Sequence, residues 1–404
     1  MLEIGLIFRA LMRNKMGALL IAFQIALTMA IMVNAIFMIQ DRQQQMKRPS
    51  GIDENNTFYL TNTVFAQDHN FQAELQTDLN KIRKTPGIVD AIQINAIPLS
   101  GGGWSMSLQL EPGEDKDAIG SALYMVDEHG INTMGLTLIA GENFSQEDIQ
   151  WRGEGQSKWP PKTIITKAFA SQLFPDDWQS AIGKTFYISQ SQPMQIIGIV
   201  EALQAPWNGW DGVERSMLVP FQMESSSSYY LIRTEAGKRD QMMPIIEKEL
   251  AERNKGRIIR RVTTIEDTRK RSYRQHNATN KILTTVVTTL TLITSFGIVG
   301  LAIFSINRRT KQIGTRRALG ANRWQIMRYF MVENFIISAV GVIIGSLAAV
   351  GLNMWLVSTF NLTPISFKLV LFGVVTLFLV GQLAVLYPAR KAALIPPATA
   401  TRTI

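Results

Sequence analysis

Four uncharged apolar segments constrain the fold of this chain more than any other feature of its sequence. A helix needs about 20 apolar residues to cross the ~30 Å hydrocarbon core of a membrane, because each residue advances it by ~1.5 Å. Each segment reaches that length without Asp, Glu, Lys or Arg; they are residues 17–39, 282–306, 334–360 and 369–388. Buried helices of soluble proteins are rarely uncharged over such lengths. The chain is therefore predicted to be an α-helical membrane protein, with transmembrane helices at 17–40, 281–306, 330–360 and 369–388.

The first apolar segment is also compatible with a secretory signal peptide. Its 23 uncharged residues exceed the usual apolar region of such peptides, and no clear small-residue cleavage site follows them. We therefore expect a retained membrane anchor.

The distribution of Lys and Arg predicts the orientation of the spans, because short cytoplasmic loops are enriched in bases. Residues 307–329 carry seven bases and no acid, whereas the short external loop 361–368 carries only Lys368. Residues 1–16 and the tail 389–404 carry three bases each, so both termini are expected in the cytoplasm. Residues 41–281 hold 27 bases and 30 acids and are predicted to lie mostly outside. The net charge of +9 thus reflects the excess of bases in the predicted cytoplasmic segments, and no nucleic-acid partner is expected.

The large outer segment 41–280 is predicted to be a mixed α/β domain. Its expected strands are 57–65, 88–97, 105–110, 122–126, 163–166, 185–189, 194–200 and 229–234. Its expected helices are 71–84 and 241–253. Strand-helix-strand units at both ends predict one α/β lobe built from separated pieces, with a β-rich lobe inserted between them. The polar run 265–281 contains no Gly or Pro. It suggests either a continuous helix into the second span or an ordinary solvated helix beside the membrane.

Catalytic chemistry is not indicated, and we predict no catalytic, cofactor-binding or metal-binding residue. Cysteine is absent and only three histidines occur, far apart in the sequence. Gly183, Lys184 and Thr185 imitate the end of a phosphate-binding loop, but Trp178 occupies the position of its first glycine. Neither a zinc-protease HExxH motif nor a serine-hydrolase GxSxG motif is present.

Small and polar residues mark helix faces inside the spans. Gly341, Gly345 and Ala349 share one face at four-residue spacing, which favours close packing of another helix. A second stripe contains Thr284, Thr288, Thr291 and Ser295. Those hydroxyls either face a partner helix or bond to backbone carbonyls four residues back. Glu333 is the single acid within the predicted spans and lies one turn inside the third, far from its middle, so an ion-driven carrier is disfavoured.

The basic loop 307–329 is the most informative cytoplasmic segment. It interleaves apolar residues with bases, and Gly320 is expected to end a helix there. Two interpretations remain open. The loop either anchors to anionic lipid headgroups or forms a short docking helix for a cytoplasmic protein.

At this loop the sequence resembles the permease subunits of ABC transporters of the MacB/FtsX/LolC-LolE superfamily, most closely the four-span MacB-type branch. The superfamily's cytoplasmic motif is matched by Ile313, Gly314, Arg316, Arg317, Ala318, Leu319, Gly320 and Ala321. Other segments match in the family's order: 9–15, 134–148, 169–185, 197–200 and 388–393. The first of them looks like the family's cytoplasmic amphipathic entry helix, which the resemblance implies for residues 1–16. The family's two glutamates in the cytoplasmic motif are replaced here by Arg308 and Gln312, and its C-terminal Asp-Pro by Pro396 and Pro397.

The resemblance implies a two-lobed MacB-like periplasmic core domain and a multi-pass protein of the bacterial inner membrane. It implies a cytoplasmic ABC ATPase dimer that binds ATP and Mg, because these 404 residues hold no ATPase motif. It also implies a second permease, identical or paralogous, and for some relatives a periplasmic adaptor and an outer-membrane channel. ATPase dimerisation would push the coupling loop, and the second span would transmit the motion to the outer domain.

Three functions remain open within this resemblance. The permease would export peptides, antibiotics or other amphiphiles, or extract lipoproteins and lipids from the outer leaflet, or regulate periplasmic hydrolases as FtsX-like relatives do. The large outer domain favours the first two functions. An anchored solute-binding receptor is the alternative outside the superfamily, and it does not explain the basic loop.

Overall fold

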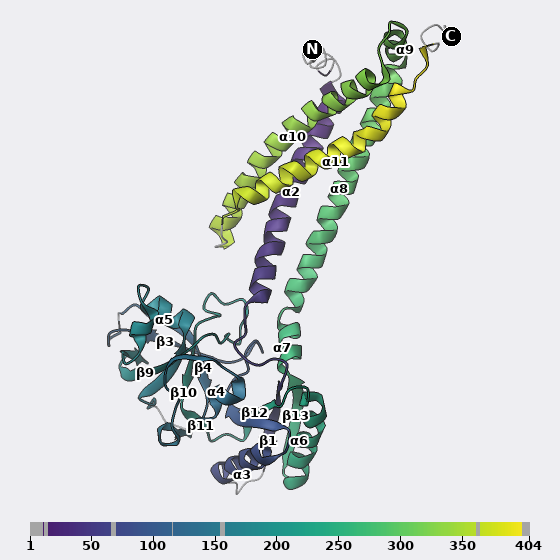
Figure 1. Ribbon diagram of the computed structural model, residues 1–404. Coiled ribbons are helices and arrows are strands. Elements are labelled where there is room, and N and C mark those ends of the chain that lie inside the picture. Colours follow the sequence, from purple (N-terminus) through teal and green to yellow (C-terminus); the bar gives the residue numbers. More distant parts are fainter. Residues whose placement is uncertain are drawn as a thin grey trace. The chain divides into compact units, whose positions relative to one another are not determined.

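The computed structural model describes residues 11, 15–65, 70–114, 116–153, 158–360 and 364–397. The described residues form two compact units (Figure 1), one of residues 47–275 and one of residues 1–46 with 276–404. We call them the outer unit and the membrane unit and describe each by itself. Most of the predicted N-terminal helix 1–16, and residues 398–404 of the predicted tail, lie outside the described residues.

Four long helices dominate the membrane unit, and each is long and apolar enough to cross a membrane. They are α2 (Lys15–Lys47), α8 (Arg274–Arg308), α10 (Arg323–Phe360) and α11 (Phe367–Ala393). The prediction of four spans is confirmed for the part of the chain described here. Each helix extends beyond its uncharged segment, because charged residues are tolerated once a helix leaves the hydrocarbon region. α10 thus begins within the range assigned to the cytoplasmic loop, and α11 continues past Pro388.

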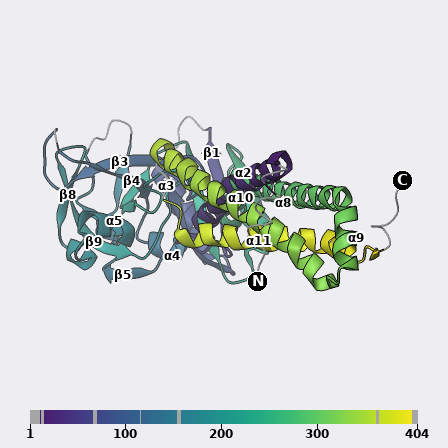
Figure 2. The ribbon, with the colours of Figure 1, turned by 90° about the horizontal axis from the view of Figure 1, so that it is seen from above.

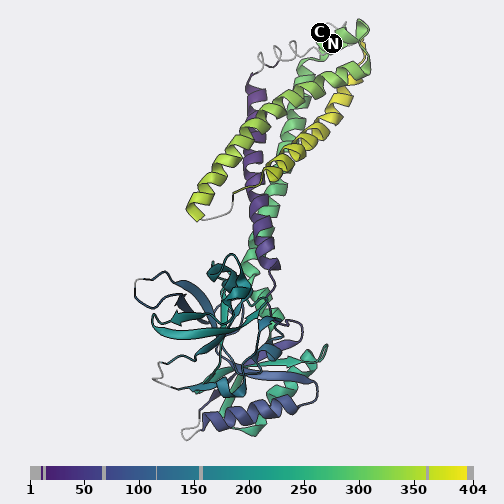
Figure 3. The same ribbon diagram turned by 60° about the vertical axis from the view of Figure 1, so that its left-hand side comes forward.

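Helices α10 and α11 lie side by side (Figures 1 and 3). The Nδ2 atom of Asn334 on α10 donates to the carbonyl oxygen of Gly381 on α11 at 3.0 Å. The rings of Phe335 and Phe378 pack 5.1 Å apart. α2 contributes the most deeply buried residues of the unit's core, including Met29 and Val33, which have no exposed surface. The unit is therefore held by close side-chain packing and a few interhelical hydrogen bonds.

The first sheet of the outer unit has four antiparallel strands in the order β13-β1-β12-β2. These strands are β13 (Arg257–Thr264), β1 (Thr57–Val64), β12 (Ser227–Thr234) and β2 (Ile88–Ile94). Helices α3 (Phe71–Lys84) and α6 (Arg239–Arg253) cover one face. Side chains alternate across β1: Phe58 and Leu60 join the core beneath these helices, and Tyr59 joins the core on the opposite face. The sheet is therefore buried on both faces.

The second sheet has the order β5-β9-β7-β10-β4-β3-β8, and β8 pairs with β9 as well as with β3. Apart from β5, these strands close into a ring. The strands are β5 (Leu138–Gly141), β9 (Gln192–Val200), β7 (Lys162–Thr166), β10 (Ser216–Val219), β4 (Ile119–Met125), β3 (Trp104–Gln109) and β8 (Thr185–Ile188). Every strand of the ring contributes to one core, which α5 (Lys167–Leu173) completes with Phe169. A small pair, β6 (Gln150–Arg152) and β11 (Phe221–Met223), and helix α4 (Gly130–Met134) complete the regular structure of this lobe.

A shared core joins the two sheets. It contains Tyr59 and Leu231 from the first sheet and Tyr124 and Leu218 from the second. The successive layers are helices, first sheet, shared core, and ring. The first sheet draws its strands from both ends of the segment and the ring draws its strands from the middle, so the predicted two-lobed organisation is confirmed.

Two features at the end of the outer segment differ from the sequence analysis. Strand β13 (Arg257–Thr264), which pairs with β1, is absent from the expected strands. Of the two interpretations left open for residues 265–281, the continuous helix into the second span is not observed, because α7 (Ile265–Ser272) ends before α8 begins. Tyr273 separates the two helices, and its side chain is buried. The Nδ2 atom of Asn208 donates to the Ser272 carbonyl at 2.9 Å, which satisfies a group that helix ends leave open.

A buried ion cluster ties α3 to β13. The Arg257 side chain has no exposed surface, and its Nη1 lies 2.7 Å from the Oδ2 of Asp78, which is also fully buried. Arg253 contacts the other oxygen of Asp78 at 2.7 Å, and the Tyr230 hydroxyl donates to Asp78 at 3.0 Å. Glu74 contacts Arg257 as well. Three side chains, those of Arg257, Arg253 and Tyr230, thus converge on the carboxylates of Asp78 and Glu74 inside the lobe.

We expect Asp78→Asn to destabilise the first sheet by about 3–5 kcal/mol, because it leaves a buried guanidinium without its main counter-charge. Hydrogen exchange of the β1 and β13 amides in the full-length chain measures this free energy. Asp240→Asn is the matched control, because the Asp240 side chain is 80% exposed and its pair with Arg239 is worth ~0–1 kcal/mol. Equal exchange in both variants would contradict the structural role of the cluster.

Candidate functional site

The predicted cytoplasmic loop 307–329 is largely helical. A short helix, α9 (Thr310–Ala318), connects the ends of α8 and α10 (Figure 2). Leu319 ends this helix, and Gly320 follows with a φ of +96°, a backbone conformation that favours glycine. The helix thus ends directly before Gly320, where the sequence predicts its end.

The two faces of α9 differ in character. Ile313 and Gly314 are buried, and Ile313 packs in a cluster with Phe330 of α10 and with Ala389 and Ala392 of α11. Leu319 is 83% exposed, and the nearby Trp324 is 60% exposed. Among the other predicted coupling residues, Arg316, Ala318 and Gly320 are exposed, and Arg317 and Ala321 are half-buried. One face therefore anchors α9 to two candidate spans, and its C-terminal end presents an apolar tip.

The bases of the segment also hold its own structure together. The Arg316 guanidinium lies 5.1 Å from the centre of the Tyr329 ring, and Arg317 donates from Nη1 to the Ala321 carbonyl at 3.2 Å. These contacts tie α9 to the start of α10. The two arginines therefore stabilise the turn besides supplying positive charge.

An ion pair joins the α8–α9 junction to α10. The Nη1 atom of Arg309 lies 3.0 Å from the Oε2 of Glu333, and the two side chains are 18% and 9% exposed. Arg309 also donates to the Tyr329 hydroxyl at 3.2 Å. Sequence reasoning singled out Glu333 but missed its partner. The sequence did hold an indication of this ion pair, because Glu333 is a lone acid that follows a segment rich in bases.

The small-residue stripe of α10 packs against α2. A Cβ atom on Gly341 would lie 2.8 Å from the Ala22 carbonyl oxygen, and one on Gly345 would lie 2.6 Å from the Cβ of Met29. Ala349 is fully buried, and its carbonyl accepts from the Nδ2 of Asn34 at 3.1 Å. The structure thus brings all of these small residues to one helix contact, where larger side chains would force the backbones apart.

The hydroxyl stripe of α8 serves its own backbone. Thr284, Thr288, Thr291 and Ser295 each donate to the carbonyl four residues earlier, at 2.7–2.8 Å, which confirms the second of the two alternatives. The hydroxyl that faces another helix is Thr294, whose Oγ1 lies 2.8 Å from the Oγ1 of Thr28 on α2.

The imitation of a phosphate-binding loop lies on a strand. Gly183 has a φ of +79°, and the chain then enters β8 at Thr185. In a phosphate-binding loop the corresponding residues open a helix whose amide groups face the phosphate. The local structure therefore differs from a phosphate-binding loop, as the sequence does with Trp178 at the position of the loop's first glycine.

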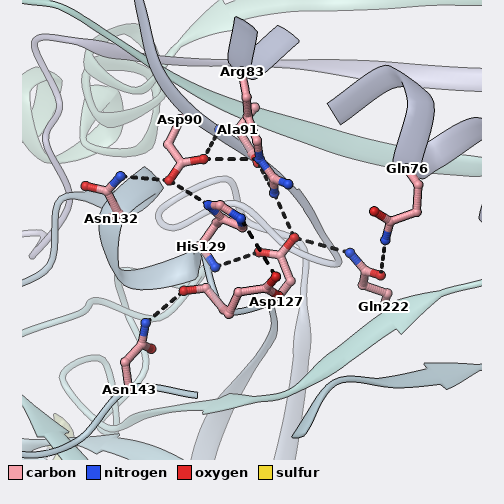
Figure 4. A network of polar contacts seen from close by, with 10 residues as sticks. Gln76, Arg83, Asp90, Ala91, Asp127, His129, Asn132, Asn143 and Gln222 are labelled. Carbon is pink, nitrogen blue, oxygen red and sulfur yellow. Dashed lines mark hydrogen bonds and ion pairs between the residues drawn. The ribbon is translucent and has the colours of Figure 1, made fainter. Parts of the chain in front are cut away.

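A polar network connects the two lobes of the outer unit (Figure 4). Arg83 of α3 contacts Asp127, which follows β4, at 2.9 Å and Asp90 of β2 at 3.2 Å. His129 lies between the lobes, and its Nδ1 is 3.0 Å from the Oδ2 of Asp90. The hydrogen bond to Asp90 raises the pKa of His129 above its ordinary value. Burial alone would raise the pKa of Asp90, but hydrogen bonds from His129 and Asn132 lower it.

Comparison with known proteins identifies relatives. Residues 284–397 match the family described as "FtsX-like permease C-terminal". The "Uncharacterized ABC transporter permease YknZ" of Bacillus subtilis is 24% identical over 420 residues, which cover 99% of this chain and 98% of that protein. The "Macrolide export ATP-binding/permease protein MacB" of Campylobacter jejuni is 27% identical over 291 residues, 67% of this chain and 43% of that protein. The chain thus covers less than half of that MacB. The family resemblance drawn from the sequence is confirmed.

Solved structures give weaker similarities. The periplasmic region of MacB from Actinobacillus actinomycetemcomitans matches with a TM-score of 0.34 and 16% identity, over 57% of this chain and 98% of that one. The extracellular domain of YknZ from Gram-positive bacteria matches with a TM-score of 0.32 and 17% identity, over 50% of this chain and 100% of that one. The fold described above rests on the chain's own strand pairings and cores.

We expect Glu333→Gln to loosen the start of α10, because it leaves the half-buried Arg309 without its counter-charge. A double-mutant cycle with Arg309→Gln should give a coupling of about 0.5–3 kcal/mol. Hydrogen exchange of the α9 and early α10 amides measures it. Arg323→Gln, at the exposed start of α10, is the matched control. Strict additivity of the two substitutions would contradict the pair.

The outer unit should lose stability as pH rises through the raised pKa of His129. Because the folded pKa exceeds the unfolded value of about 6.5, this contribution is fully present below that pH and absent well above the folded pKa. Amide exchange in β2 and α4, followed from pH 6 to 9 and corrected for intrinsic rates, measures the slope. His129→Gln should flatten it, and an unchanged slope would exclude His129 as its source.

Proposed function

We propose that this chain, which carries an FtsX-like permease domain and has MacB and YknZ ABC transporter permeases as homologues, is a non-catalytic membrane subunit driven by a separate ATPase. The ATPase dimer binds ATP and Mg in the cytoplasm, and this chain binds neither. The permease pairs with a second copy or with a paralogous permease. Both termini and α9 lie in the cytoplasm of a bacterial cell, and the outer unit lies beyond the inner membrane.

The observation that carries this proposal is the two-sided character of α9. Its exposed tip, Leu319 with Trp324, is an apolar surface among bases, which suits insertion into a groove of a cytoplasmic protein. Its buried side contacts α10 and α11 through Ile313. The Arg309–Glu333 pair links the base of α9 to α10. A push on the tip is therefore delivered to packed helices and is not absorbed by a flexible loop.

The replacement of the family's two glutamates leaves this docking mode possible. Arg308 lies at the end of α8, where its guanidinium is 5.3 Å from the centre of the Phe304 ring, and Gln312 is exposed on α9. Neither belongs to the buried anchor. We infer that the apolar tip supplies most of the contact and that the partner ATPase presents a surface suited to a base at position 308 and a neutral amide at position 312.

The transported material in this proposal is a peptide, an antibiotic or another amphiphile, moved from the periplasm or from the outer leaflet of the membrane. Export by mechanical transmission requires no polar path through the four helices. In the membrane unit as described, the hydroxyl stripe of α8 (Thr284, Thr288, Thr291 and Ser295) bonds to its own backbone, which supports this view. A periplasmic adaptor and an outer-membrane channel are further partners of the exporting form. Extraction of lipoproteins or lipids is the alternative cargo, and regulation of periplasmic hydrolases is the alternative function.

We expect Leu319→Glu to weaken association with the ATPase about tenfold or more, the change that ~1.4 kcal/mol produces. The tagged full-length chain is purified from its host in neutral detergent, and the copurifying Walker-motif ATPase and its ATP hydrolysis are quantified. Leu394→Glu is the matched control, because this leucine is also exposed and lies just past α11. Arg316→Glu with Arg317→Glu should also weaken association, partly by loosening the turn.

Two results would overturn the proposal. Hydrolysis of ATP by a preparation free of any ATPase subunit would contradict the non-catalytic assignment. Equal copurification with the Leu319→Glu chain and with the arginine-reversed chain would contradict docking through α9 and would favour anchoring to anionic lipid.

A further inference from the structure

A cavity of about 430 Å³ opens in the outer unit, apart from the polar network between the lobes. This volume is within the ~300–1,000 Å³ typical of small-molecule sites. Four segments line it: the paired strands β1 and β12, a glycine-containing loop, the turn after Ala205, and the end of β13 with α7. The side chains that line it include those of Tyr59, Leu99, Trp207, Tyr229, Arg261 and Arg271.

Two unpaired guanidinium groups give the cavity a positive charge. Arg261 and Arg271 line it, and within the described part of the chain neither side chain has a hydrogen bond or an ion pair. Other arginines of the outer unit, such as Arg83, Arg233 and Arg269, contact carboxylates. The described residues that line the cavity include no Asp or Glu. An anion entering it would therefore meet two bases without a competing acid.

The backbone around the cavity is held in sparsely populated conformations. Arg261 has a φ of +54° at the point where the register between β13 and β1 shifts, so a bulge redirects this residue. Leu99 has a φ of +64°, and its amide donates to the Ala205 carbonyl at 3.2 Å. Gly101, with a φ of +86°, donates to the Pro206 carbonyl at 2.9 Å. For the two non-glycine residues, Arg261 and Leu99, such conformations cost ~1–3 kcal/mol each and persist where the surroundings enforce them, often at binding sites.

The remaining wall is aromatic and apolar. Tyr59 and Tyr229 meet edge to face with ring centres 5.8 Å apart, and Trp207 packs in the same way against Trp210 at 6.0 Å. Each pair fixes its rings before any ligand arrives. Leu99 adds an aliphatic surface beside them. The cavity thus offers a rigid apolar wall next to two bases.

We propose that this cavity binds an anionic amphiphile, with a phosphate or carboxylate group held by Arg261 and Arg271 and an apolar portion packed against Trp207 and Tyr229. A lipid headgroup with its glycerol and a free aromatic phosphate share this chemistry. The proposal goes beyond the coupling function and needs no ATPase, so each can fail without the other.

Calorimetric titration of the full-length chain in neutral detergent tests the proposal. The probes are dihexanoyl phosphatidylglycerol, dihexanoyl phosphatidylcholine, phenyl phosphate and inorganic phosphate. We expect at least one anionic amphiphile to bind at least tenfold more tightly than both phosphatidylcholine and inorganic phosphate. Preference for phosphatidylglycerol identifies a lipid as the source of the ligand, and preference for phenyl phosphate identifies a soluble compound.

Substitutions assign the binding to this cavity. Arg261→Gln and Arg271→Gln should each weaken the preferred probe about tenfold, and Trp207→Phe should remove a binding-induced change in tryptophan fluorescence. Arg260→Gln is the matched control, because Arg260 is the exposed neighbour on the same strand and does not line the cavity. Unchanged amide exchange in β1 and β12 verifies that each variant is folded. Absence of binding by both anionic amphiphiles, or equal losses in the Arg260 and Arg261 variants, would overturn the proposal.

Discussion

The exclusion of charge from the hydrocarbon core is the constraint on which the arrangement of this molecule depends. It leaves the central parts of four helices without ionisable side chains, so recognition and force must act at the helix ends. The structure places α9 at such an end and fastens it there with an apolar cluster and one ion pair. The membrane unit thus consists of packed helices whose ionisable side chains lie at or near the helix ends.

Sequence patterns predicted the parts of the fold that follow from local periodicity. Hydropathy found the spans, and helical spacing of Leu75, Leu79 and Ile82 found α3 with its observed bounds. β13 was missed because three arginines interrupt its apolar alternation, and pairing with β1 supplies what its own residues lack. The break between α7 and α8 depends on the burial of Tyr273 and on Asn208, which lies far away in sequence. Neither feature is visible in a local window.

The sequence predicted which segment forms the candidate coupling site, but it did not predict which residues of that segment are buried and which are exposed. Ile313 and Leu319 are both apolar and close in sequence, yet one is buried and the other exposed. That distinction arises because the end of α11 covers one side of α9. Arg309 and Glu333 meet across 24 positions of the chain, and their pairing depends on how α10 turns back. Residue type indicated where the site lies, and only tertiary packing separates its anchor from its tip.

The ring formed by β8 pairing with β9 also decides where another polypeptide could add a strand. Within the described residues, the ring strands use both sides of their backbones, and β5 is the one short strand of that sheet with a free side. In the first sheet the outermost strands are β13 and β2. β13 carries bases along its length, which repel a second copy of the same strand. Edge-to-edge self-association is therefore discouraged in the ring by its topology and at β13 by its charge.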